Sequence, residues 1–236
     1  MINVPKMQEL TLQMKKIPHC QDYDIGDVGK LIPLGQTEKK MVNLRKIIPA
    51  NMSGDYVLDI GCNKGFFCID AVRRGASWVL GIEGRVGLFD ILNKIPMYIG
   101  EKIAFYNCQF EDFEIIRKFH LIYCFSVYHL IYLKVKDHDE IFRKLAKCLH
   151  GTGSVILELP LSLDDNFASD AFDAADLTKE EKDNYNPYRI LHAASKHFGR
   201  VTHMCNSGFL RTRNVLLLTD PNEVASPQFT AEWEVE

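Results

Sequence analysis

The stretch from Tyr56 to Gly84 constrains the fold most strongly, because it has the residue pattern of a strand, a turn, a helix and a second strand. Apolar residues flank Asp59 on both sides, which is typical of a strand buried on both faces. Gly61 and Gly65 bracket the turn, and the second apolar run ends at Glu83. A βαβ unit with glycines in its turn and an acidic residue after its second strand predicts an α/β fold that binds a nucleoside-containing ligand at the carboxyl ends of its strands.

The glycine spacing then narrows the class of ligand. A dinucleotide fingerprint requires G-x-G-x-x-G, but Asn63 and Phe66 occupy the second and third glycine positions. A phosphate-binding loop is also excluded, because no Lys-Ser/Thr pair follows the turn. A ligand with a ribose but without a pyrophosphate fits better, and the carboxylate of Glu83 can accept hydrogen bonds from both ribose hydroxyls.

The pattern acidic-x-Gly-x-x-x-Gly, formed by Asp59, Gly61 and Gly65 and followed by an acidic residue at Glu83, resembles the class I S-adenosylmethionine-dependent methyltransferases. The resemblance covers residues 54–160 well and the remainder by topology only. It implies a Rossmann-like, seven-stranded, mostly parallel sheet with helices on both faces and an antiparallel C-terminal hairpin. It also implies S-adenosylmethionine as the cofactor. The competing interpretation is a βαβ unit that binds nothing and contains incidental glycines.

The resemblance further implies which residues contact the cofactor. An acidic or amide side chain just past the strand at 103–106 meets the adenine amino group in the family, so either Glu111 or Asp112 inherits that role; Asp112 could instead cap a following helix. Phe125 and Ser126 should border the methionine portion. The full predicted set of cofactor-binding residues is Asp59, Gly61, Cys62, Asn63, Gly65, Glu83, Gly84, Phe110, Glu111, Asp112, Phe125 and Ser126.

Tyr128 and His129 are the predicted catalytic residues, because methyl-transfer sites of this fold lie at the end of the strand at 120–125. Transfer from a sulfonium is an in-line displacement, and an alcohol acceptor also needs a base. Of the eight histidines, only His129 falls at that predicted position, and histidine titrates near working pH. The alternative is a histidine that is hydrogen-bonded beneath a lid. The Tyr-His pair is similar to that of tRNA wobble-uridine modifying enzymes and of sugar and natural-product methyltransferases.

A metal-assisted mechanism is the competing arrangement. Residues 164–166 (Asp-Asp-Asn) resemble half of the divalent-ion site of catechol-type methyltransferases. The strand at 120–125 ends in Phe-Ser and supplies no carboxylate to complete that site. We therefore predict no metal.

The remaining segments are predicted from periodicity and from breaker residues. Residues 1–36 form an arm, which either closes over the ligands or only packs; residues 37–220 form the methyltransferase domain; and 221–236 form a polar tail. Residues 161–185 form an acidic lid with eight carboxylates and two lysines. Helices are predicted over 7–16, 37–48 (capped by Thr37), 86–95, 137–149 and 190–198, and strands over 103–106, 120–125, 154–159, 201–205 and 213–218.

Composition limits the partners and the compartment. A net charge of -3 gives no general attraction to nucleic acid or to an anionic membrane, and no run approaches about 20 apolar residues. The seven scattered cysteines contain no C-x-x-C pair, and cytoplasm is the default location. We expect O- or N-methylation, with O favoured, of a small-molecule or carbohydrate acceptor, with an RNA-modifying enzyme and a non-catalytic binding module as alternatives. Nothing in the sequence indicates the oligomeric state.

Overall fold

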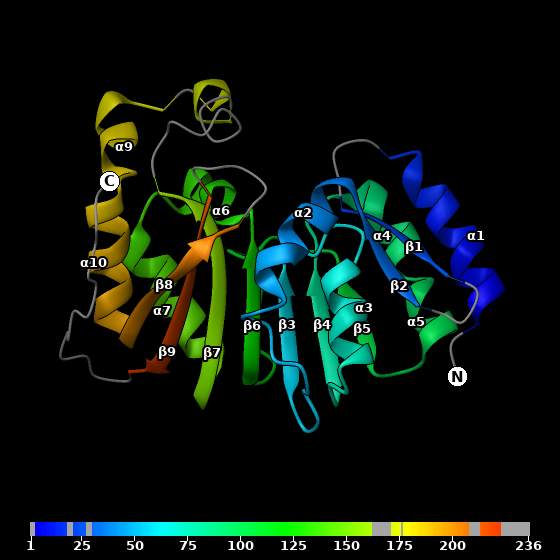
Figure 1. The fold of residues 1–236 in the computed structure, drawn as a ribbon. Coiled ribbons are helices and arrows are strands. Elements are labelled where there is room, and N and C mark those ends of the chain that lie inside the picture. The colour runs from blue at the N-terminus through cyan, green and yellow to red at the C-terminus, as the bar shows by residue number, and fades with distance from the viewer. Residues whose placement is uncertain are drawn as a thin grey trace. The chain divides into compact units, whose positions relative to one another are not determined.

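The computed structural model describes residues 3–17, 21–26, 30–161, 171–175, 177–207 and 213–222. Its main sheet has seven strands in the order β5-β4-β3-β6-β7-β9-β8, and β1 and β2 form a separate two-stranded sheet (Figure 1). The main-sheet strands are β3 (Tyr56–Ile60), β4 (Trp78–Ile82), β5 (Ile103–Tyr106), β6 (Phe119–Phe125), β7 (Leu149–Pro160), β8 (Phe198–Asn206) and β9 (Arg213–Pro221). The predicted Rossmann-like sheet with an antiparallel C-terminal hairpin is confirmed.

The chain divides into two compact units, Met1–Phe113 and Glu114–Glu236, which are described separately. In the first unit, β3 pairs in parallel with β4, and β4 pairs in parallel with β5. Helix α3 (Phe66–Arg73) connects β3 to β4, as the βαβ pattern predicts. The segment predicted as one helix over 86–95 is instead α4 (Val86–Leu92) and α5 (Ile95–Ile99). Pro96 does not end a helix but lies in the first turn of α5, where its missing N–H costs nothing.

Residues 3–44 of the first unit add an arm that the sequence predicted only in part. Helix α1 (Val4–Lys15) is capped by the side chain of Asn3 and packs against β1 (Asp22–Ile25). Strand β1 pairs antiparallel with β2 (Leu31–Leu34), where no strand was predicted. Helix α2 (Gly35–Leu44) starts two residues before the predicted cap, so that Thr37 is buried inside the helix rather than capping it.

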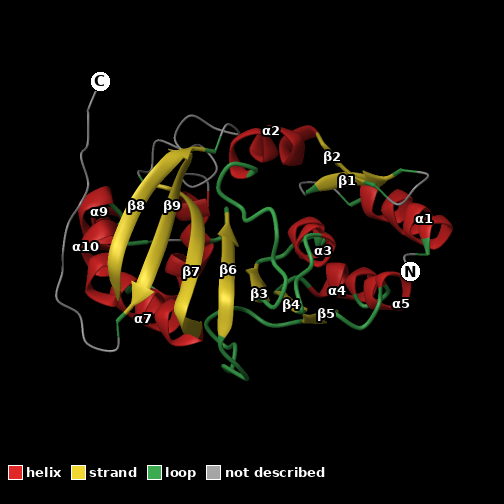
Figure 2. Cartoon of the chain, turned by 60° about the horizontal axis from the view of Figure 1, so that its bottom comes forward, coloured by secondary structure: helices red, strands yellow, loops and turns green. Residues whose placement is uncertain are grey.

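In the second unit, β6 and β7 are parallel, and β9 runs antiparallel between β7 and β8. Helices α7 (His138–Cys148) and α10 (Pro187–His197) contact each other and lie on the same face of these strands (Figure 2). Their N-termini are capped by the side chains of Asp137 and Asn186. Helix α6 (Tyr128–Val135) was not predicted, and neither was α9 (Lys179–Asn184), which begins with a Thr178–Glu181 capping box.

Two predicted segments fall mostly or partly outside this description. Residues 162–170 and 176 of the predicted acidic lid, and residues 223–236 of the predicted tail, lie outside the described residues. The Asp164–Asn166 half-site is among them. Within the part of the chain that the structure describes, no helix combines the length and the apolar character that a membrane crossing requires.

Candidate cofactor site and acceptor region

The glycine loop, residues 61–65 between β3 and α3, has the left-handed backbone that its sequence predicts. Gly61, Asn63 and Gly65 have φ values of 67°, 55° and 79°. A Cβ at Gly65 would lie 3.2–3.3 Å from side-chain atoms of Ile95, Phe105 and Leu92, so that this position requires glycine for space as well as for conformation. Asparagine is one of the few other residues that adopt positive φ readily, which explains Asn63. The loop is therefore a tight turn with a left-handed backbone at three of its five residues.

Glu83, directly after β4, holds its carboxylate over this loop. Its Oε2 accepts a hydrogen bond from the backbone N–H of Asn63 at 2.9 Å, and its Oε1 accepts one from the N–H of Arg85 at 3.0 Å. The Arg85 guanidinium adds a contact at 3.2 Å. An ionised carboxylate has about four acceptor positions, so capacity is left for a ligand hydroxyl. The donor and acceptor set of Glu83 and the loop fits a ribose-bearing ligand.

Asp59, the acidic residue of the motif, is buried inside the first unit at 1% exposure. The thiol of Cys68 on α3 donates a hydrogen bond to its Oδ2 at 3.2 Å. Burial raises the pKa of Asp59 from 3.8 to about 7, against the lowering effect of the Cys68 hydrogen bond. Cys62, also in the predicted cofactor set, is fully buried beside this pair, and burial raises the pKa of its thiol.

The segment after β5 contains the residues predicted to meet adenine. Phe110 is buried, Glu111 is partly exposed and Asp112 is exposed. No helix begins at Asp112, since residues 113–118 have no helical structure, so the capping alternative is wrong. Gly84 lies against the side chain of Gln109, which a Cβ would displace.

In the second unit, Ser126 follows β6 with a φ of 56°, which is uncommon for serine. Its hydroxyl donates a hydrogen bond to Oε2 of Glu158 at 2.6 Å, and its backbone N–H donates one to the Glu158 carbonyl at 3.0 Å. Glu158 lies in β7 with its side chain fully buried, and the preceding Phe125 is buried as well. Sequence reasoning missed Glu158, although a single carboxylate in an otherwise apolar strand was an available signal.

Tyr128 and His129 are neighbours in α6, and both are buried. The Tyr128 hydroxyl lies 2.7 Å from Nδ1 of His138, and Nε2 of His138 lies 3.1 Å from the carbonyl oxygen of Asn184. Because a carbonyl only accepts, Nε2 carries the hydrogen, and Nδ1 accepts from the Tyr128 hydroxyl. Burial lowers the pKa of His138 to about 4, which keeps it neutral. His138 was not singled out from the sequence, since no motif marks it.

The described part of the predicted lid is anchored by this same region. Tyr132 donates a hydrogen bond to the carbonyl of Glu181 at 2.9 Å, and its ring stacks on that of Phe172. Three of the lid carboxylates are paired with lysines, at 2.6–2.9 Å: Glu181 with Lys136, Asp183 with Lys179, and Asp173 with Lys182. Lys179 and Lys182 belong to the lid itself, so only Lys136 adds a positive charge that the composition of the lid does not contain.

Among the residues placed in the structure, no group of three or more His, Cys, Asp or Glu side chains is arranged to hold a metal ion. The half-site at residues 164–166 lies outside them.

Known proteins share both the motif and the fold. Residues 57–153 match the family model of a methyltransferase domain. A curated relative, the magnesium-protoporphyrin O-methyltransferase of Rhodobacter capsulatus, is 25% identical over 130 residues, which cover 55% of this chain and 56% of that protein. The match thus spans little more than half the length of the relative.

Two solved structures show the same fold. One, provisionally identified as an S-adenosylmethionine-dependent methyltransferase from Listeria monocytogenes, has a TM-score of 0.59 at 16% identity, covering 78% of this chain and 99% of that one. The other is geranyl diphosphate C-methyltransferase from Streptomyces coelicolor, with a TM-score of 0.55 at 12% identity and 79% of each chain covered.

The match over residues 57–153 is to a methyltransferase domain, and the fold is that of solved S-adenosylmethionine-dependent methyltransferases, in agreement with the resemblance seen in the sequence. The predicted enzyme class and its cofactor agree with these matches.

Proposed function

We propose that this chain binds S-adenosylmethionine at the glycine loop and Glu83 and methylates a small-molecule acceptor. The observation that carries the proposal is the Glu83 carboxylate, held over a left-handed glycine loop by the N–H of Asn63 at 2.9 Å. This carboxylate can accept the hydroxyls of a ribose, and the loop brings backbone groups close to the ligand. Phe110 and Glu111 or Asp112 are assigned to the adenine, and Phe125 and Ser126 to the methionine portion.

In this mechanism the cofactor supplies an electrophilic methyl group, and the residues of this chain orient the reactants. Glu83 would hold the ribose and so orient the bound cofactor. His129 takes the proton of a hydroxyl acceptor or orients that acceptor. Tyr128, whose hydroxyl is hydrogen-bonded to His138, acts by fixing the helix that carries His129.

The acceptor class is the finer part of the proposal. We favour O-methylation of a small hydroxylated compound, with carbohydrates included. The name of the Rhodobacter relative specifies an O-methyltransferase, whereas the Streptomyces neighbour methylates carbon, so relatives support small acceptors without agreeing on the atom. An RNA substrate is the second candidate, suggested by the Tyr128–His129 pair alone. The cytoplasmic location inferred from the sequence belongs to the same proposal.

Ligand binding tests the cofactor assignment. Titration calorimetry should show that the protein binds S-adenosylmethionine and not NAD. Glu83→Gln keeps the side-chain volume but removes the charge, and hydrogen bonds to charged groups are worth about 1.5–3 kcal/mol, so the dissociation constant should rise roughly 10- to 150-fold. Glu101→Gln, at an exposed site in the same unit, is the matched control. Preferential binding of NAD, or an unchanged affinity in Glu83→Gln, would refute the assignment.

Methyl-label transfer tests the acceptor and His129. Small hydroxylated compounds, sugars and bulk tRNA are incubated separately with labelled cofactor. Once an acceptor is found, His129→Ala should lose turnover while the cofactor affinity stays within a few-fold; full activity would remove His129 from the mechanism. His150→Ala, which changes an exposed histidine of the same unit, is the control. Cofactor binding without label transfer to any acceptor would favour the non-catalytic module, and label in tRNA would favour the RNA enzyme.

A further inference from the structure

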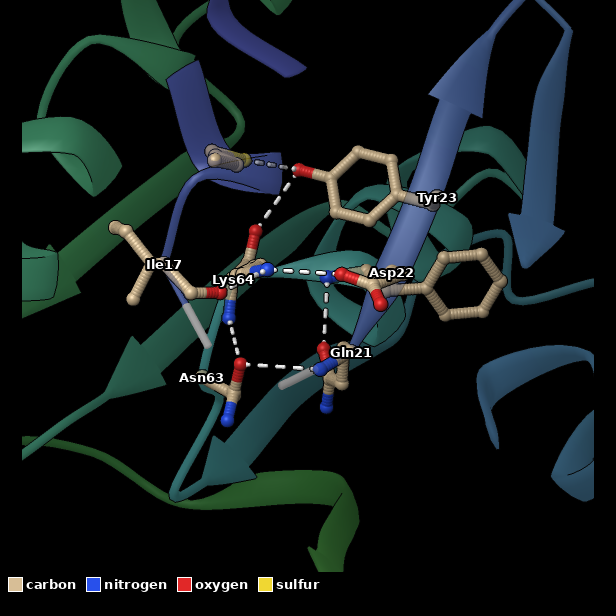
Figure 3. A network of polar contacts seen from close by, with 8 residues as sticks. Ile17, Gln21, Asp22, Tyr23, Asn63 and Lys64 are labelled. Atoms are coloured by element: carbon tan, nitrogen blue, oxygen red, sulfur yellow. Dashed lines mark hydrogen bonds and ion pairs between the residues drawn. The ribbon is translucent and has the colours of Figure 1, made fainter. Parts of the chain in front are cut away.

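Lys64, in the middle of the glycine loop, is a buried cation. Its side chain is 1% exposed, yet its Nζ forms an ion pair with Oδ1 of Asp22 at 2.8 Å and donates a hydrogen bond to the carbonyl of Ile17 at 3.0 Å (Figure 3). Both partners belong to the arm, more than 40 residues earlier in the chain. Burying a lysine ammonium is costly without a partner, so this loop conformation depends on the arm for its charge compensation.

Three further contacts join the same two segments. The side-chain oxygen of Gln21 accepts the N–H of Phe66 at 3.1 Å, and the N–H of Gln21 donates to Oδ1 of Asn63 at 3.3 Å. The hydroxyl of Tyr23 donates to the carbonyl of Lys64 at 2.8 Å. Gly65, the N-cap position of α3, has no side chain to cap the helix, so Gln21 supplies that cap from the arm. The arm therefore contacts the loop at Asn63, Lys64 and Phe66.

Asn63 links this network to the ligand side of the loop. Its Oδ1 accepts hydrogen bonds from the arm and from the N–H of Lys64 at 2.8 Å, while its own N–H donates to the Glu83 carboxylate. A displacement of the loop at Lys64 would thus move the N–H that orients Glu83.

We propose that the Lys64–Asp22 ion pair is a latch that holds the glycine loop and Glu83 in their ligand-binding geometry, so that the arm sets the affinity for the cofactor. Lys64 and Asp22 are positioning residues in this scheme, since neither needs to touch the ligand. The inference rests on the proposed function where it predicts a change in affinity for the cofactor. Its prediction for hydrogen exchange is measured on the ligand-free protein and does not need the cofactor.

The test compares latch variants with a matched ion pair in the same arm. Lys64→Met and Asp22→Asn remove the charge with little change in size. Lys15→Met and Asp24→Asn remove the Lys15–Asp24 pair, which has an N–O distance of 2.7 Å and joins β1 to α1 without reaching the loop. Each variant is measured by calorimetry with S-adenosylmethionine, well below its unfolding temperature, and by hydrogen exchange of the free protein.

Each latch variant should raise the dissociation constant for S-adenosylmethionine about 10-fold or more, and the double variant should be no weaker than Lys64→Met alone, because both changes break one interaction. The control variants should stay within 2-fold of the wild type. In the free protein, the amides of Asn63, Lys64 and Phe66 should exchange faster in the latch variants and at the wild-type rate in the controls. If the ion pair only packs the arm, the latch variants should have a lower unfolding temperature and an unchanged dissociation constant for S-adenosylmethionine.

The outcomes separate this inference from the proposed function. If the wild type binds S-adenosylmethionine and both latch variants bind it within 2-fold, the latch is refuted while the function stands. If the wild type does not bind it, the function fails, and wild-type exchange at the three loop amides in the variants would still refute the latch. Asp22→Asn, which leaves Lys64 in place, keeps the test available if Lys64→Met does not fold.

Discussion

Asp59 makes the stability of this protein depend on pH in a direction opposite to that of most carboxylates. Burial raises its pKa from 3.8 to about 7, so that the folded state keeps it protonated over a range in which the unfolded chain has already ionised it. The unfolded state therefore binds fewer protons than the native state between about pH 4 and pH 7. Since stability falls with pH wherever that holds, the Asp59 contribution is complete below pH 4 and is lost as the pH rises to 7.

The magnitude follows from the pKa difference. Each pKa unit corresponds to about 1.4 kcal/mol, so a change from 3.8 to about 7 corresponds to a loss of about 4 kcal/mol above pH 7. Asp59→Asn has nearly the same shape and stays neutral at every pH. The variant can also accept a hydrogen bond from the Cys68 thiol, as Asp59 does at 3.2 Å.

Urea unfolding of the wild type and of Asp59→Asn, measured from pH 4 to pH 8, isolates this contribution, because all other titrations cancel in the difference. As the pH increases, the free energy of unfolding of Asp59→Asn should rise relative to that of the wild type, by up to about 4 kcal/mol. Cys68→Ala should extend the loss to higher pH, since it removes the hydrogen bond that lowers the pKa of Asp59. A difference between Asp59→Asn and wild type that stays constant across this range would refute the reasoning.

Two further substitutions test local geometry. Tyr128→Phe removes the hydroxyl that is hydrogen-bonded to His138 at 2.7 Å and leaves a buried acceptor without its donor, so the free energy of unfolding should fall by about 1–3 kcal/mol. Tyr188→Phe, which changes an exposed tyrosine, is the control. Equal stability of the two variants would argue against a structural role for the Tyr128 hydroxyl. Gly65→Ala places a Cβ at φ 79° among three apolar side chains and should destabilise the protein by about 1–3 kcal/mol in thermal unfolding. Gly87→Ala, at a position in α4 with open space around it, should be neutral or stabilising. Similar effects at both glycines would contradict the assigned loop conformation.

Local patterns predicted the elements around the glycine loop well, because buried parallel strands are apolar runs and the turn needs glycines. The loop also explains the two departures from the dinucleotide fingerprint. Asn63 adopts the left-handed backbone of the glycine it replaces and uses its side chain as an acceptor. Phe66 packs against Tyr23 of the arm, with ring centroids 5.7 Å apart.

The arm and the buried polar groups were not predictable in the same way. Strand β2 contains Pro33, and proline argues against a strand except at an edge, which is where this two-stranded sheet places it. Lys64 was passed over because an isolated lysine is normally solvated, and its counter-charge at Asp22 becomes a neighbour only in three dimensions. His138 likewise gains its two partners from residues 10 and 46 positions away.

The position of Asp22 has a consequence for how the protein can be made. Residues 54–160 carry the clearest sequence resemblance to the methyltransferases, and a domain boundary drawn there would leave out the partner of Lys64. A chain trimmed in this way would lose the ion pair of Lys64 with Asp22 and the cap that Gln21 gives to α3. Asp22 and Lys64 are 42 positions apart in the sequence, and contacts of high sequence separation form slowly during folding. The glycine loop is local in sequence, but we expect it to reach its final shape only after Asp22 has folded back onto it.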